Sequence, residues 1–201
     1  MRNTPSLLVL ATTLALPALA LGHPGHAGQA GNGFANGLMH PITGWDHMLA
    51  LIAVGLLAAR IGRRALWAVP AAFLGSCAIG GIAALCGISL PAVELMILTS
   101  IFIPAWLIGR DAGATLITAA VVATLFGAFH GFAHFADMVP SDAAGRYALG
   151  LLATSAGVLA MSVIAGRLVG RSANAISRPS QLWRFAGVAL SASAVVLFVA
   201  A

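Results

Sequence analysis

Histidine and carboxylate side chains gather in two short motifs of this sequence. The first, His40–His47, reads HPITGWDH, and the second, Phe129–Asp137, reads FHGFAHFAD. Imidazole and carboxylate groups together suit Ni²⁺, Co²⁺ or Zn²⁺, whereas copper(I) prefers sulfur ligands. The two motifs therefore predict a site for a divalent transition-metal ion.

The spacing of the second motif places its ligands on one side of a helix. His130, His134 and Asp137 follow one another at intervals of four and three residues, so they share a helical face. Two imidazoles at positions i and i+4 can bind a single metal ion. We expect His130, His134 and Asp137 to be metal ligands.

The first motif is expected to begin a helix at Pro41, because proline suits the first helical turn. His40 and His47 are seven residues apart, so a single helix would stack them on one face. Asp46 could bind metal itself or accept the second N–H of a ligating imidazole. Gly44 leaves room for another helix to approach.

Three further residues are candidate ligands outside the two motifs. His23 and His26 belong to the glycine-rich segment 23–37, which we predict to be an exported tail that captures ions. Glu94 lies early in an apolar run and is expected at the same level of the membrane as the motif histidines. Ionisable groups inside a bilayer are costly and usually face a cavity or a partner.

The elements that must position these residues are transmembrane helices. The chain has 201 residues, of which 60% are hydrophobic and 7% are charged, whereas soluble domains carry about 25% charged residues. Crossing a bilayer takes about 20 apolar residues. Six such runs lie near residues 38–59, 65–86, 89–109, 113–138, 144–166 and 182–201. The sequence predicts an all-α membrane protein, a bundle of about six transmembrane helices in one domain, 38–201.

The N-terminal 22 residues resemble a cleavable signal peptide. Arg2 supplies the positive charge, residues 7–16 form a short apolar core, and small residues follow as far as Ala20. Cleavage after Ala20 or after Gly22 fits this pattern. The second cut would give His23 a free amine as an additional ligand.

The distribution of arginine predicts the orientation of the bundle. All ten basic residues are arginines, and eight would lie on one side if the spans alternate: Arg60, Arg63, Arg64, Arg110, Arg167, Arg171, Arg178 and Arg184. Positive loops stay in the cytoplasm, so the mature N-terminus and both histidine motifs are expected outside. Because these arginines occupy short loops, the positive charge does not indicate a nucleic-acid partner.

The two motifs resemble those of the HupE/UreJ family of nickel/cobalt permeases, HPxxGxDH and FHGxAHGxE. The first pattern is complete, whereas in the second Phe135 replaces a glycine and Asp137 replaces a glutamate. The resemblance implies six spans in a bacterial cytoplasmic membrane, no enzymatic activity, no permanently bound cofactor and a link to nickel-enzyme maturation. It also implies metal-binding roles for His40, Asp46, His47, His130 and His134.

The function predicted from the sequence is secondary uptake of nickel or cobalt, with zinc as an open alternative. The sequence has no P-loop, so a gradient or a partner would drive transport. Because imidazoles bind metal only when neutral, affinity should fall below about pH 6.5. Two other functions stay open: a membrane haem protein with facing histidine ligands, and a metal sensor or metal-delivery accessory. A homo-oligomer also stays open.

Overall fold

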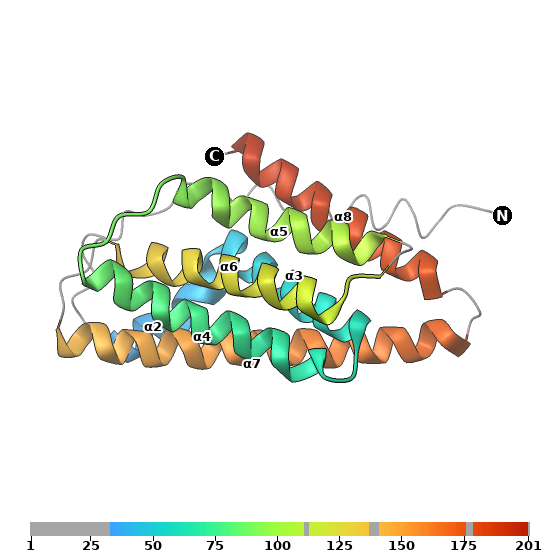
Figure 1. Cartoon of the computed structure of the whole chain (residues 1–201), viewed down its shortest axis with the longest axis horizontal. Helices are drawn as coiled ribbons and strands as arrows, with labels where there is room; N and C mark the ends of the chain where they lie inside the picture. The colour runs from blue at the N-terminus through green and yellow to red at the C-terminus, as the bar shows by residue number, and fades with distance from the viewer. Residues whose placement is uncertain (1–32, 111–112, 137–140, 176–178, 201) are drawn as a thin grey trace.

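The computed structural model describes residues 33–110, 113–136, 141–175 and 179–200, and every regular element within them is a helix. The prediction of an all-helical chain is confirmed for these residues. In chain order the helices are α2 (Gly33–Thr43), α3 (Trp45–Ile61), α4 (Ala65–Leu85), α5 (Val93–Gly109), α6 (Leu116–Phe135), α7 (Asp142–Ala175) and α8 (Pro179–Ala200). The long α7 runs along one side of the bundle, and α8 packs mainly against α5 (Figure 1).

Helices of membrane-spanning length make this a multi-pass membrane protein. Four are long and apolar enough to cross a bilayer: α4, α6, most of α7 and most of α8. The bent pair α2 and α3 adds a fifth span if the two count as one, whereas α5 is an apolar helix of only 17 residues. Each of the six predicted runs thus contains a helix, but the count of six spans stays a prediction. The predicted signal peptide lies outside the described residues.

The first predicted span is broken, which corrects the expectation of one helix starting at Pro41. Pro41 lies inside α2, and α2 and α3 meet at an angle of 75°. Gly44 separates them with an extended backbone, φ −87° and ψ 103°. A proline inside a helix removes one backbone hydrogen bond and weakens the turn around it. His40 and His47 therefore lie on different helices and do not share a helical face.

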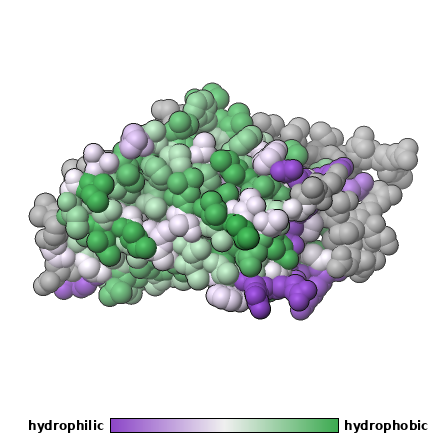
Figure 2. All heavy atoms as spheres, viewed as in Figure 1, coloured by the Kyte–Doolittle hydropathy of each residue, from purple (hydrophilic) through white to green (hydrophobic). Residues whose placement is uncertain are grey.

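The helices that follow alternate in direction and bring most of the described arginines to one end, whereas Arg146 lies near the start of α7. Arg60, in the last turn of α3, donates hydrogen bonds to the carbonyl oxygens of Ile108 and Arg110, where α5 ends. Its guanidinium also lies 5.9 Å from the ring centre of Trp183, near the start of α8. We call this the arginine end. It also includes Arg63, Arg64, Arg167 and Arg184. Figure 2 shows hydrophilic residues here and hydrophobic residues over the middle of the same face.

Glycines allow α4 and α6 to pack backbone to backbone. A Cβ atom added at Gly131 would overlap the carbonyl oxygen of Cys77, and one added at Gly127 would overlap that of Phe73. Small residues at such positions let membrane helices approach closely. Because His130 and His134 flank Gly131 on α6, this contact helps to fix the position of the second motif.

A similar contact holds α2 against α7. A Cβ atom added at Gly37 would overlap the carbonyl oxygen of Tyr147, and one at Gly150 would overlap that of Phe34. The hydroxyl of Thr154 donates a hydrogen bond of 2.8 Å to the carbonyl oxygen of Leu38. These contacts position His40, which lies one turn further along α2.

Candidate metal centre

Four histidine rings from three helices meet at the opposite end of the bundle from the arginine end. The ring centroid of His134 lies 4.6 Å from that of His40 and 4.5 Å from that of His47. His47 also lies 4.9 Å from His130 and 5.7 Å from His40. We call this set the histidine cluster. The two motifs, about 80 residues apart in the chain, thus meet in one place.

Three of these histidines can present ligand atoms to a single ion. One ring nitrogen each from His40, His47 and His134 lies within 4.8 Å of the other two. Because metal–nitrogen bonds are about 2.0–2.1 Å long, neighbouring ligands in a tetrahedral site are about 3.4 Å apart. A modest inward movement would therefore complete the site. His47 and His134 are buried, whereas His40 is half-buried and forms the more accessible side.

Asp46 orients the ring of His47. Its Oδ1 atom lies 2.8 Å from Nδ1 of His47 and also accepts a hydrogen bond of 2.8 Å from the backbone N–H of that residue. A carboxylate accepts the Nδ1 proton, so the lone pair of the neutral ring is on Nε2. Nε2 of His47 is buried and has no hydrogen-bond partner among the described residues. Of the two roles open to Asp46 from the sequence, this geometry favours orientation of the ligand.

His130 is held in the same way by the backbone. Its Nδ1 donates a hydrogen bond of 3.0 Å to the carbonyl oxygen of Phe126, since a carbonyl can only accept. The lone pair is therefore on Nε2, which is buried and has no hydrogen-bond partner among the described residues. Buried polar atoms are rarely left without a partner. Both His47 and His130 therefore offer an Nε2 lone pair that a cation could bind.

Among the other predicted ligands, only Glu94 lies within the described residues, and it is not part of this cluster. Glu94 is exposed near the start of α5. It does not belong to the group of ligand atoms that His40, His47 and His134 form. His23, His26 and Asp137 lie outside the described residues. Sequence reasoning missed Tyr147 of α7, whose ring centroid lies 6.0 Å from that of His40. Tyr147 is the only tyrosine of the chain, and this was the available signal.

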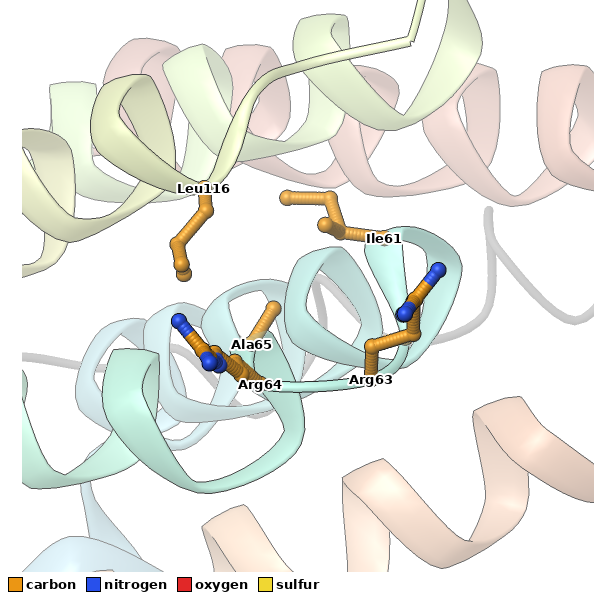
Figure 3. A pocket seen from close by; sticks show the side chains of 6 residues that line it. Ile61, Arg63, Arg64, Ala65 and Leu116 are labelled. Atoms are coloured by element: carbon orange, nitrogen blue, oxygen red, sulfur yellow. The ribbon is translucent and has the colours of Figure 1, made fainter.

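A hollow of about 350 Å³ lies at the arginine end, away from the histidine cluster. It is lined by Ile61, Gly62, Arg63, Arg64, Ala65 and Leu116. In Figure 3 the side chains of Arg63 and Arg64 point away from each other, on either side of Ala65. Because guanidinium groups carry positive charge and have no acceptor atom, this hollow does not suit a metal cation.

Comparison with known proteins identifies the family of this chain. Residues 10–197 match the family model described as HupE / UreJ protein. The chain is 36% identical to Protein HupE of Rhizobium leguminosarum bv. viciae over 146 residues, which cover 73% of this chain and 76% of the relative. No solved structure matches the chain significantly. The match extends over almost the whole sequence and includes both histidine motifs, so the chain belongs to the HupE/UreJ family.

Proposed function

We propose that this protein is a permease that carries nickel or cobalt ions across the cytoplasmic membrane into the cell. The observation that carries the proposal is the approach of His40, His47 and His134 within an apolar helical bundle. Ionisable side chains are expensive among membrane helices and are typical of ion pathways. The chain belongs to the HupE/UreJ family, and its motifs resemble those of nickel/cobalt permeases. This resemblance supports the same function.

The chemistry of the cluster suits an ion that binds and then leaves. Imidazole is an intermediate ligand that accepts Ni²⁺, Co²⁺ and Zn²⁺. Three imidazoles leave at least one coordination position open for water or for a further ligand. The ion could shed its water ligands one at a time as each ring replaces them.

The two ends of the bundle support inward transport. Positive loops are retained in the cytoplasm, so we assign the arginine end to the cytoplasmic side and the histidine cluster to the outside. A site that faces outward favours uptake. The predicted tail, with His23 and His26, would collect ions there after removal of the signal peptide.

The packing of the rings favours a small ion over a haem group. Centroid distances of 4.5–5.7 Å leave the rings in contact with one another, whereas two axial histidines must stand on opposite faces of a porphyrin. A purified protein with no Soret absorption band would agree with this choice. A metal sensor or delivery accessory would bind ions but carry no flux.

Flux into proteoliposomes tests the proposal. Purified protein is reconstituted around a metal-sensitive dye, and external Ni²⁺, Co²⁺ or Zn²⁺ is added with and without a pH gradient. We expect wild-type flux well above that of empty liposomes, and a loss of at least tenfold in His40→Ala and His134→Ala.

Ser193→Ala provides a matched control, because this hydroxyl donates a hydrogen bond within α8, to the carbonyl oxygen of Ala189, and lies on a helix that carries no member of the histidine cluster. It should transport as the wild type does. Wild-type flux no greater than that of empty liposomes, or equal to that of both histidine variants, would refute the function.

A further inference from the structure

We propose that the histidine cluster provides two successive positions for the transported ion. The outer position consists of His40, His47 and His134, and the inner position consists of His47 and His130, so that His47 serves both. This inference rests on the proposed function, because it divides the same cluster into two steps along one path.

Depth separates the two positions. The helix α6 begins beside Ile61 and Ala65 at the arginine end and ends at the histidine cluster. His130 precedes His134 by four residues, so it lies about 6 Å closer to the arginine end along the helix axis. His40 is half-buried, whereas His130 is only 2% exposed. An ion that enters from outside therefore meets the outer position first.

His47 can reach an ion in either position. Its ring centroid lies 4.5 Å from that of His134 and 4.9 Å from that of His130. Because Asp46 engages Nδ1, only Nε2 of His47 can bind, and one lone pair holds one ion at a time. The positions are therefore occupied in turn. Neighbouring sites of moderate strength allow an ion to leave as readily as it enters.

The inner position is built from two orphaned ring nitrogens. Nε2 of His47 and Nε2 of His130 are both buried and lack a hydrogen-bond partner among the described residues. Their opposite nitrogens are engaged by Asp46 and by the carbonyl oxygen of Phe126, which fixes both tautomers. Leaving a buried polar atom unsatisfied is unfavourable, and a passing cation would satisfy both. The ring centroid of Phe73 lies 5.3 Å from that of His130, and Phe73 belongs to the apolar core. The inner position therefore borders the apolar core.

The number of ligands predicts different roles for the two positions. The outer position offers three imidazoles and the inner position two, so an ion at equilibrium should rest in the outer one. His134 should then control capture, and His130 should control transfer inward. Loss of His134 is expected to raise Kd, whereas loss of His130 is expected to lower the maximal flux and leave Kd almost unchanged.

Two matched asparagine variants test this division in the full chain. In His130→Asn the amide nitrogen can still donate to the carbonyl oxygen of Phe126, but Nε2 is lost. Titration calorimetry with NiCl₂ and flux into proteoliposomes are measured for both variants. We expect His134→Asn to raise Kd at least tenfold. We expect His130→Asn to keep Kd within about threefold of wild type and to reduce maximal flux at least tenfold.

The visible spectrum of bound Co²⁺ gives a second readout that does not depend on flux. It should change in His134→Asn and stay as in wild type in His130→Asn. If His130→Asn does not fold, His130→Gln replaces it with the same expectations.

Either of two results would overturn the proposal. If Kd rises as much in the His130 variant as in His134→Asn, the four histidines form a single site. If the maximal flux of the His130 variant equals that of the wild type, His130 does not lie on the ion path. A wild-type protein that binds no Ni²⁺ or Co²⁺ would instead refute the proposed function itself.

Discussion

Removing the carboxylate of Asp46 should weaken metal binding without changing the ligands of the ion. Asp46 contacts His47 twice, at ring Nδ1 and at the backbone N–H, both at 2.8 Å. Both contacts orient the ring so that Nε2 faces the cluster. The side chain of Asp46 is 13% exposed, so water competes little for these contacts.

The size of the effect follows from the kind of bond that each variant keeps. Loss of a partner that orients a metal ligand typically costs 10–100-fold in affinity, which corresponds to about 1.4–2.7 kcal/mol. Asp46→Ala removes both contacts and should lie near the upper value, about 100-fold. An amide oxygen can still accept both hydrogen bonds, but a neutral bond is about half as strong as a charged one. Asp46→Asn should therefore lose about half of the free energy, or about tenfold in affinity.

Calorimetric titration of the purified protein with NiCl₂ measures these affinities, and the Co²⁺ spectrum reports the ligand set. If Asp46→Asn loses as much affinity as Asp46→Ala and the Co²⁺ spectrum of both changes, Asp46 is itself a ligand of the ion. If Asp46→Ala binds Ni²⁺ within twofold of wild type, Asp46 does not orient the ligand.

Three other substitutions test how the helices position the cluster. Gly131→Ala should destabilise the protein by about 1–3 kcal/mol, since the new Cβ overlaps the carbonyl oxygen of Cys77. It should also lower nickel flux. Thermal unfolding measures the first effect and dye flux the second. Thr154→Val should cost about 0.6 kcal/mol, the average for hydrogen bonds between membrane helices, because it loses the bond to the carbonyl oxygen of Leu38; the half-saturating nickel concentration should rise two- to threefold. Arg60→Ala should lower the thermal unfolding midpoint and leave nickel Kd unchanged, since its partners lie at the arginine end.

Each of these substitutions has a control and a contrary result. Ser193→Ala, on α8, should match the wild type in stability and flux. Wild-type stability of Gly131→Ala would show that α4 can move away from α6 at no cost. An unchanged nickel dependence in Thr154→Val would mean that α2 is held by its glycine contacts alone. A raised Kd in Arg60→Ala would show that the two ends of the bundle are coupled.

The two motifs differ in how well residue spacing predicted the relative positions of their side chains. His130 and His134 lie within one helix, so the helical period correctly placed them on one face. The same reasoning failed for His40 and His47, because the chain bends by 75° between them. The period predicts side-chain directions only while the helix continues, and Gly44 interrupts it. The two rings still meet, at 5.7 Å, but through packing of separate helices.

The sequence by itself determined the helical membrane class, the arginine-rich side and the identity of the two motifs. Those features depend on hydrophobic runs, loop charge and residue order, all of which are local properties of the chain. Tertiary structure decided which nitrogens are free to bind, since Nδ1 of His47 is engaged by Asp46 and Nδ1 of His130 by the backbone. It also decided that Glu94 is exposed and apart from the clustered ligand atoms. Distances between helices depend on how their surfaces fit together, here through glycines whose partners lie far away in the chain.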